Sequence, residues 1–248
     1  MTALDHHRED WELLGEIDPL WAALTNADRR GQGWDVDAFM ATGEEEIAGV
    51  LADAERIGAA PRLGHALDFG CGAGRLTRAL GRRFEEAVGV DISESMIRLA
   101  ERLNADVRSC RFEVNDRSDL MRFDDGAFDF SYSALVLQHM PSRDVAAHYV
   151  AELMRVTRGG IVVFGAPDRI ALPYRLGLAR RAFVVLRRLG VSGDTLLRRT
   201  PLTPMRMTAL PEQVVRSIVE RAGGTIRHID RRDEGGVVMA RYFVAASE

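Results

Sequence analysis

The sequence predicts an α/β fold with a doubly wound, mostly parallel sheet, and three observations support that prediction. Short apolar runs alternate with helical patterns from residue 65 onward, which is typical of consecutive β-α-β units. The first run leads into a glycine-rich turn, and the second ends in an acidic residue, Asp91. A chain of 248 residues with 46% hydrophobic content suits one such domain with additions.

The apolar runs define the expected elements in order. Strands are predicted at residues 65–70, 86–91, 109–115, 127–133, 159–165, 225–230 and 237–245. Helices are predicted between the first five, at residues 74–83, 93–103 and 142–157, with Ser93 as the N-cap of the second. The last two strands are joined by residues 231–236, and so short a turn makes only an antiparallel pair.

Residues 1–60 are expected to form an N-terminal helical cap over the ligand-facing edge of the sheet. Apolar spacing predicts helical structure over residues 8–24, with Asp18-Pro19 as a helix start, and a second helix over residues 36–57. The segment holds 14 acidic residues against 4 arginines, a net charge of −10 within a chain whose net charge is −4. We therefore expect a solvated surface here.

Residues 168–211 form a basic insertion, with 9 arginines against 2 acidic residues and a net charge of +7. Apolar residues recur at helical spacing, with Pro173 in the first turn: Leu172, Leu176, Ala179, Phe183 and Leu186. Four arginines lie off that apolar stripe: Arg180, Arg181, Arg187 and Arg188. Three readings remain open. The helix covers the substrate pocket, recognises a phosphorylated, acyl or carrier-bound substrate, or lies on a membrane surface.

Composition excludes several classes of protein. All 33 basic residues are arginine, so the lysine required by P-loop, pyridoxal and protein kinase sites is missing. Two cysteines make neither a disulfide framework nor a zinc cluster, and the histidines show no metal-ligand spacing. No apolar run approaches the length of a transmembrane segment, and the charged N-terminus predicts a cytoplasmic protein. The acidic balance disfavours nucleic acid as a partner.

The motif that carries chemistry is HALDFGCGAG at residues 65–74, followed by EAVGVD at residues 86–91. Glycines in such a turn let the backbone approach a ligand closely, and an acid ending the second strand can bind ribose hydroxyls. Position 75 is Arg, where the dinucleotide-binding fingerprint has its third glycine. The pattern is therefore acid-x-G-x-G-x-G, and it indicates a different nucleoside-containing ligand.

This stretch resembles motif I of the class I S-adenosylmethionine-dependent methyltransferases, and the resemblance extends over residues 64–167. FEVNDRSDLMRFDDGAFDFSYSALVLQHMP is similar to the third and fourth strands of that family, and RVTRGGIVVFGAP to the fifth. The resemblance implies sheet order 3-2-1-4-5-7-6 with an antiparallel last strand, and a Rossmann-like methyltransferase domain at residues 61–248. More loosely, the chain resembles bacterial small-molecule methyltransferases with an N-terminal helical cap.

The resemblance also implies S-adenosylmethionine as cofactor and assigns its contacts. Asp68 attracts the ligand ammonium group, the glycine turn at a helix N-terminus favours its carboxylate, and Asp91 binds ribose beside Ile92 at the adenine plane. Asp116 receives the adenine amino group and the Arg117 amide a ring nitrogen; Asn115 replaces Asp116 if the register shifts by one. The full expected set is Asp68, Gly70, Cys71, Gly72, Gly74, Asp91, Ile92, Met96, Asn115, Asp116, Arg117 and Ser133.

Methyl transfer is an in-line displacement that needs no metal and no covalent nucleophile. His139, in LVLQHMP, is the candidate base or substrate contact, and its alternative role is to cap or pack the following helix. Residues 133–136 read SALV, where methyltransferases of nucleic-acid bases carry Asn/Asp-Pro-Pro-Tyr/Phe. We therefore expect a small-molecule acceptor, with oxygen preferred and nitrogen or carbon open.

Two rival functions remain. One is a nicotinamide-dependent oxidoreductase, which Arg75 and the missing Tyr/Lys pair of short-chain reductases disfavour. The other is a non-catalytic protein that binds S-adenosylmethionine as a sensor or scaffold. The substrate and the oligomeric state are not determined by the sequence.

Overall fold

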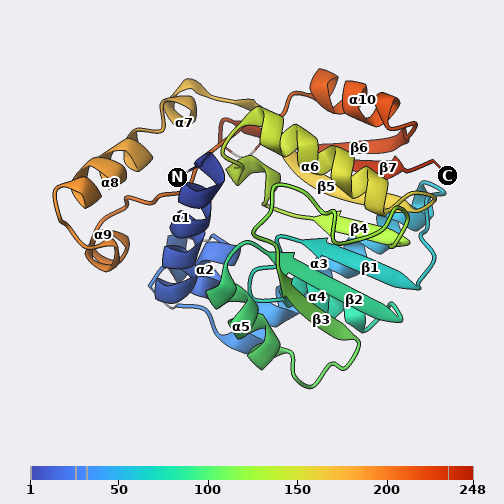
Figure 1. The fold of residues 1–248 in the computed structure, drawn as a ribbon, viewed down its shortest axis with the longest axis horizontal. Coiled ribbons are helices and arrows are strands. Elements are labelled where there is room, and N and C mark those ends of the chain that lie inside the picture. The colour runs from blue at the N-terminus through green and yellow to red at the C-terminus, as the bar shows by residue number, and fades with distance from the viewer. Residues whose placement is uncertain (1, 26, 32, 234, 248) are drawn as a thin grey trace.

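A computed structural model describes residues 2–25, 27–31, 33–233 and 235–247, and within these ranges the strands form one seven-stranded sheet (Figure 1). Its order is β3-β2-β1-β4-β5-β7-β6. β7 runs antiparallel to both neighbours, and the other pairs are parallel, as predicted. The strands are β1 His65–Phe69, β2 Glu86–Asp91, β3 Cys110–Val114, β4 Phe130–Ser133, β5 Ile161–Ile170, β6 Thr225–Asp233 and β7 Val237–Ala245.

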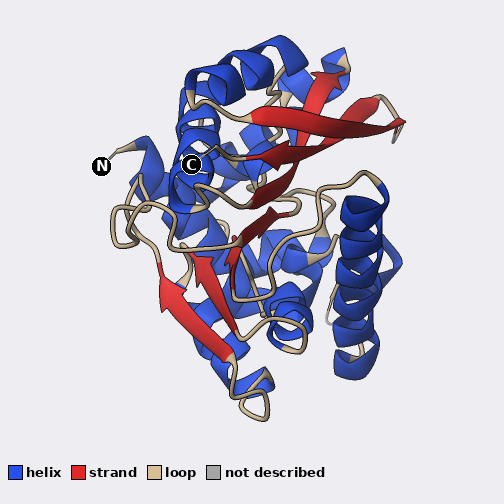
Figure 2. Cartoon of the chain, turned by 90° about the vertical axis from the view of Figure 1, so that its right-hand side faces the viewer, coloured by secondary structure: helices blue, strands red, loops and turns tan. Residues whose placement is uncertain are grey.

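Helices cover both faces of the sheet, as Figure 2 shows with the strands in the middle. α6 (Arg143–Val156) and α10 (Glu212–Arg221) pack on one face through an apolar core that includes Leu153 and Val215. α3 (Val36–Arg56) and α4 (Arg75–Gly81) pack on the other face around Val50 and Leu80. This two-sided cover explains why the central strands β1 and β4 are almost entirely buried.

Of residues 1–60, expected as a cap over the ligand-facing edge, only α1 (Ala3–Ile17), α2 (Pro19–Ala23) and a short 3-10 helix at Ala27–Arg29 form the cap, whereas α3 packs on a face of the sheet. It packs against α5 (Glu94–Leu103) and against α8 (Leu178–Arg188) and α9 (Gly193–Arg199), which follow α7 (Leu172–Leu176) at the left of Figure 1. The shared apolar cluster includes Leu14 and Trp21 of the cap, Met96 of α5, and Phe183 and Leu197 of the insertion. The acidic cap and the basic insertion therefore dock on each other.

Most expected elements are confirmed. Each strand lies within a few residues of its prediction, and α3, α4, α5 and α6 match their predicted helices. Ser93 is the N-cap of α5, because its hydroxyl accepts a hydrogen bond from the Met96 amide at 3.2 Å. Glu234, in the predicted turn between the last two strands, lies outside the described residues.

Three expectations after the fifth strand are wrong. The single helix expected from Leu172 to Leu186 is broken at Gly177, whose left-handed backbone (φ 57°) ends α7 and begins α8. β5 runs on to Ile170, because its extension pairs with β7. α9 and α10 were not predicted. A Val215–Ile218–Val219 stripe after Pro211 was the available signal for α10.

A buried ionic network joins α3 to α4 and β4. Arg75 is only 4% exposed, and its guanidinium donates to Glu46 at 2.7 Å. The Tyr132 hydroxyl donates to the other oxygen of Glu46, also at 2.7 Å. Burial alone would raise the pKa of Glu46, but Arg75 and the Tyr132 hydrogen bond outweigh it and hold this pKa below its usual range. Glu46 thus stabilises a buried positive charge at the helix contact.

We predict that Glu46→Ala lowers the free energy of unfolding by about 3 kcal/mol, because it leaves the Arg75 guanidinium buried without its carboxylate. Urea unfolding followed by circular dichroism measures the change. Glu45→Ala, on the exposed side of the same turn, is the matched control and should change it by less than about 0.5 kcal/mol. Equal effects of the two substitutions would contradict the role of the network.

Candidate active site

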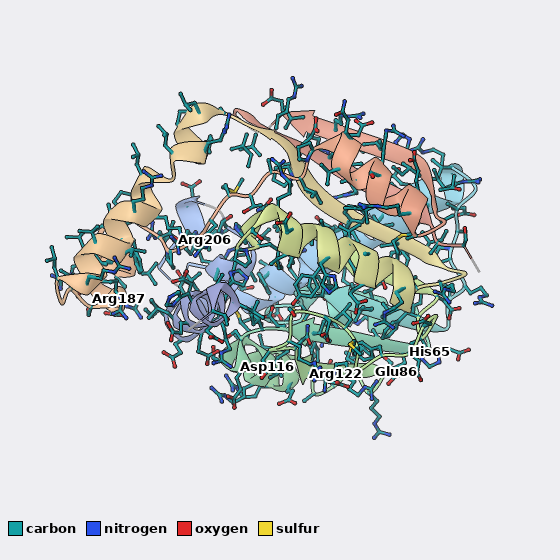
Figure 3. All side chains as sticks on the ribbon, turned by 45° about the horizontal axis from the view of Figure 1, so that its top comes forward. His65, Glu86, Asp116, Arg122, Arg187 and Arg206 are labelled. Atoms are coloured by element: carbon teal, nitrogen blue, oxygen red, sulfur yellow. The ribbon has the colours of Figure 1, made fainter. Side chains whose placement is uncertain are left out.

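A cavity opens at the carboxyl ends of β1, β2, β3 and β4, beneath the cap. In Figure 3, Asp116 marks this end of the sheet, and His65 and Glu86, which begin β1 and β2, mark the other. The lining residues come from the cap, the glycine turn and the segments that follow the four strands: Leu4, His7, Trp11, Ala22, Ala23, Phe69, Gly70, Gly72, Val90, Asp91, Ile92, Met96, Asn115, Ala134, Leu135, Val136, His139, Met140 and Tyr149. This is the edge at which open parallel sheets bind ligands.

The turn after β1 requires its glycines. Gly70, Gly72 and Gly74 all have positive φ, at 77°, 52° and 83°. A Cβ on Gly70 would also collide with the side chain of Val136, and one on Gly74 would lie 2.5 Å from the Asn104 side chain. The backbone of the turn is therefore exposed directly to the cavity at Gly70 and Gly72.

Asp91 ends β2 and fixes this turn. One carboxylate oxygen accepts the Gly72 amide at 2.9 Å, and the other accepts the Ser93 amide at the same distance. Burial raises the pKa of Asp91, and the hydrogen bonds from the Ser93 and Gly72 amides oppose that rise. Each oxygen keeps further acceptor capacity on a side chain that lines the cavity.

Asp68 lies behind the turn and does not line the cavity. Its side chain is completely buried, and the Thr77 hydroxyl donates to one oxygen at 2.6 Å. The other oxygen has no hydrogen-bond partner within the described residues. Burial raises the pKa of Asp68 to about 7, against the opposing effect of Thr77. The carboxyl group therefore changes protonation near neutral pH.

The residues after β3 divide between the cavity and solvent. Asn115 is buried and lines the cavity, and its side-chain oxygen lacks a hydrogen-bond partner in the described structure. Asp116 and Arg117 are exposed, and the Arg117 side chain pairs with Asp119 at 3.2 Å. The Arg117 carbonyl accepts the Tyr149 hydroxyl, which closes the loop behind Asn115. The structure thus favours the register in which Asn115 takes the place expected for Asp116.

Ile92 and Met96 line the cavity as apolar walls, whereas Cys71, Gly74 and Ser133 lie outside the lining. Burial raises the pKa of the Cys71 thiol, so Cys71 is a protonated filler in the turn. The Ser133 hydroxyl donates to the Phe69 carbonyl at 3.2 Å and joins β4 to β1. Of the twelve residues expected at the cofactor, the structure brings Gly70, Gly72, Asp91, Ile92, Met96 and Asn115 into the cavity wall.

His139 lies in a 3-10 turn (Leu137–His139) after β4 and also lines the cavity. Its Nδ1 is 2.7 Å from the carbonyl oxygen of Arg206, which can only accept, so Nδ1 carries a proton. Burial lowers the pKa of His139 to about 4, against the effect of that hydrogen bond. The ring is therefore neutral near pH 7. The Nε2 atom of His139 keeps a lone pair, which faces the side-chain amide nitrogen of Gln138 at 3.1 Å.

The cap contributes a second histidine that the sequence reasoning missed. His7 is 4% exposed and lines the cavity, and Trp11 lies between the two histidine rings, with centroids 6.2 Å from His7 and 5.3 Å from His139. Burial lowers the pKa of His7 to about 3, and His139, Arg206 and Arg180 act in the same direction. The spacing of His7 and Trp11, one helical turn apart, was the signal available in the sequence.

A second hollow of about 580 Å³ meets the first at Ala134 and Leu135. It lies between α3 and the face of β5, β6 and β7 and is polar, with Glu45, Asp230 and Arg241 among its lining residues. Leu135 has φ 61°, a left-handed conformation that is strained for a residue with a side chain. No other non-glycine residue in the described chain has a positive φ. The strained residue forms the partition between the two hollows.

Within the described ranges, no group of three or more His, Cys, Asp or Glu side chains could hold a metal ion. The same residues contain no helix long and apolar enough to cross a membrane.

Known methyltransferases resemble this chain in sequence and in fold. A family model described as "Methyltransferase domain" matches residues 67–164, the segment from β1 to β5 that forms the floor of the cavity. A magnesium protoporphyrin IX methyltransferase from Synechocystis, solved with bound S-adenosylmethionine, shares the fold with a TM-score of 0.64. It is 18% identical, and the similarity covers 100% of this chain and 98% of that one. Residues 67–164 thus match a methyltransferase domain, and the chain has the fold of this S-adenosylmethionine-binding methyltransferase.

Two curated methyltransferases match the domain in sequence. The 2-methyl-6-phytyl-1,4-hydroquinone methyltransferase of Synechocystis is 35% identical over 99 residues, which are 39% of this chain and 30% of that protein. The ubiquinone biosynthesis O-methyltransferase of Alkalilimnicola ehrlichii is 30% identical over 107 residues, which are 42% of this chain and 41% of the relative. The chain thus matches less than half the length of either relative.

The buried polar atoms of the methyltransferase domain fit its cofactor. The free oxygen of Asn115 suits an adenine amino group, and the spare acceptor capacity of Asp91 suits ribose hydroxyls. The bare backbone at Gly70 and Gly72 leaves room for a close approach. Asp68, by contrast, is separated from the cavity by the turn, so any effect on a ligand ammonium group acts through the turn or through water.

We predict that Asp68 makes the domain less stable as pH rises. Its pKa in the folded protein, about 7, lies above the ordinary value of 3.8, so the folded state holds its proton longer than the unfolded state does. The free energy of unfolding therefore falls between about pH 4 and pH 7, by up to about 4 kcal/mol, and the loss is complete above pH 7.

Asp68→Asn removes this titration, so the variant should gain stability relative to wild type as the pH rises from 4.5 to 8. Thermal unfolding of both proteins across that range measures the difference, and titrations shared by the two proteins cancel. Parallel stability profiles for wild type and variant would contradict the prediction.

Proposed function

We propose that the protein transfers a methyl group from S-adenosylmethionine to an oxygen atom of a small-molecule acceptor. The observation that carries the proposal is the neutral imidazole of His139, which shares one cavity with Asp91 and the glycine turn. A base with a free lone pair and a nucleoside-binding edge thus face the same space. That is the arrangement an acceptor hydroxyl needs.

On the cofactor side, Asp91 would bind the ribose hydroxyls and Asn115 the adenine amino group, and the glycine turn, whose bare backbone lines the cavity at Gly70 and Gly72, would let the carboxylate end approach closely. Ile92 and Met96 would enclose the adenine between apolar surfaces. When bound, S-adenosylmethionine supplies a methyl group on a positively charged sulfur. These assignments are supported by the cavity lining and by the unpartnered oxygen of Asn115.

On the acceptor side, Nε2 of His139 accepts the hydroxyl proton as the oxygen becomes nucleophilic, replacing its contact with the Gln138 amide. The hydrogen bond from Nδ1 to the Arg206 carbonyl fixes the ring orientation and the tautomer. His7 and Trp11 close the cavity from the cap and exclude water. In-line geometry then supplies much of the remaining rate.

The acceptor class follows from two supports. The relatives are named for a hydroquinone and for O-methylation in ubiquinone biosynthesis, which favours a hydroxylated ring. The Arg206 guanidinium is partly buried, and its Nε has no hydrogen-bond partner among the described residues, which favours an acceptor with a negative charge or carrier group near the cap. The net charge of −4 disfavours nucleic acid as a partner, and the proposal includes a cytoplasmic location.

Calorimetric titration tests the cofactor. We expect micromolar binding of S-adenosylmethionine and S-adenosylhomocysteine, lost with Asp91→Ala and weakened about tenfold with Asn115→Ala, because a buried acceptor is removed. Asp116→Ala, at the exposed next position, is the matched control and should bind normally. Binding of NADH alone would overturn the proposal in favour of an oxidoreductase.

Methyl transfer to a panel of hydroquinones and catechols tests the base. His139→Gln should lower the rate of methyl transfer about 100-fold and leave the affinity for S-adenosylmethionine unchanged. His148→Gln, at an exposed position, should leave the rate unchanged. Because the pKa of His139 is lowered to about 4, its contribution should be constant between pH 6 and 8 and disappear only toward pH 4. Cofactor binding without turnover on any acceptor would leave a non-catalytic binding protein as the answer.

A further inference from the structure

The insertion exposes an unusual amount of apolar surface. Nine large apolar side chains are exposed in the described chain, and six of them fall between residues 172 and 189. They are Leu172 (63%), Tyr174 (47%), Leu176 (41%), Leu178 (62%), Val185 (53%) and Leu189 (74%). Scattered apolar residues on a surface are ordinary, but a contiguous group on one protruding segment marks an interaction surface.

α8 has two faces with different roles. Phe183 is 2% exposed and packs into the cluster with Leu14 and Trp21, so it defines the inward face. At 100° per residue, the opposite face carries a stripe of five residues, all of them exposed: Leu178, Arg181, Val185, Arg188 and Leu189. The outward face therefore alternates apolar side chains with guanidinium groups.

Four arginines of α7 and α8, two of them on the outward face of α8, are unpaired within the described structure. Arg175, Arg181, Arg187 and Arg188 make no ion pair with any described residue, and Figure 3 shows Arg187 at the outer tip of the insertion. The sequence from residue 169 to residue 193 contains six arginines and no acidic residue. Arg180, on the inner side of α8, does pair, with Asp10 of the cap at 3.4 Å. The outer positive charge is therefore available to an external anion.

We propose that α7 and the outward face of α8 dock on the surface of an anionic lipid membrane. Leucine and valine side chains enter the boundary between headgroups and acyl chains, and arginines with apolar stems reach the lipid phosphates from the same face. Charge complementarity selects this partner, because a second copy would have to supply a matching acidic apolar face and a nucleic acid would leave the exposed leucines in water. Among the described residues no helix is long and apolar enough to cross a bilayer, and the proposal concerns docking on its surface.

The docking face is coupled to the cavity through the cap. Arg180 and Phe183 hold α8 against α1, and α1 carries His7 and Trp11 over the cavity. Docking would therefore bring the cap side of the cavity to the bilayer surface, where a lipid-soluble acceptor resides. The docking face is defined by the exposed apolar side chains and the arginines of the insertion, and it does not depend on the proposed methyl transfer.

Vesicle sedimentation tests the surface without any methyl transfer, so its outcome is independent of the proposed activity. The protein should bind vesicles of phosphatidylcholine mixed with phosphatidylglycerol, bind pure phosphatidylcholine much more weakly, and lose binding as salt increases. Arg181→Gln with Arg188→Gln should weaken the binding about 30-fold. Leu178→Ser, Val185→Ser and Leu189→Ser together should weaken it at least tenfold.

Matched controls remove similar groups elsewhere. Leu63→Ser with Met121→Ser and Arg102→Gln with Arg108→Gln change exposed residues on other surfaces and should bind like wild type. Circular dichroism confirms that every variant is folded. Absence of binding to anionic vesicles, or equal binding by the α8 variants and wild type, would overturn the proposal. So would a dimer in light scattering that the α8 substitutions dissociate, because the face would then be a subunit interface.

Discussion

The carboxylate of Asp91 holds the ligand-facing edge of the sheet together. It binds the Gly72 amide of the turn after β1 and the Ser93 amide at the start of α5, so two β-α connections share one acceptor. The glycines can adopt their left-handed turn without steric cost, and Asp91 keeps that turn in place. The two connections that Asp91 joins carry the cavity residues Gly70, Gly72 and Met96.

The cap is the second constraint, and apolar burial establishes it. Leu14 and Trp21 of the acidic segment meet Phe183 and Leu197 of the basic segment, with Met96 of α5 beneath them. The large difference in charge between the two segments contributes the Asp10–Arg180 pair, which is partly exposed and therefore a minor stabilising term. The cap gives the cavity a roof, with His7 and Trp11 facing His139.

The two buried histidines show how enclosure changes chemistry. Both pKa values are lowered chiefly by burial, so both rings are neutral at the pH at which a free histidine would be partly charged. His139 has a backbone partner that fixes its tautomer, and within the described ranges His7 has none. A cavity with a neutral, oriented imidazole and apolar walls suits a reaction in which a proton leaves the acceptor and water must be excluded.

The sequence alone determined the strands, their mostly parallel arrangement and the residues at the ends of the first strands, because apolar period, glycine turns and strand-end acids are local signals, whereas the strand order followed from the family resemblance. Asp91 and the glycine turn followed directly from spacing. Only the tertiary structure shows that Asn115, and not Asp116, lines the cavity, because the pairing of β3 with β2 sets which side chain after β3 faces inward. It also decided that His7 reaches the cavity and that the apolar stripe of the insertion divides at Gly177, leaving Leu172 and Leu176 exposed. The packing of the cap over the cavity and against the insertion depends on contacts between segments more than 100 residues apart, such as Trp11 with His139 and Leu14 with Phe183.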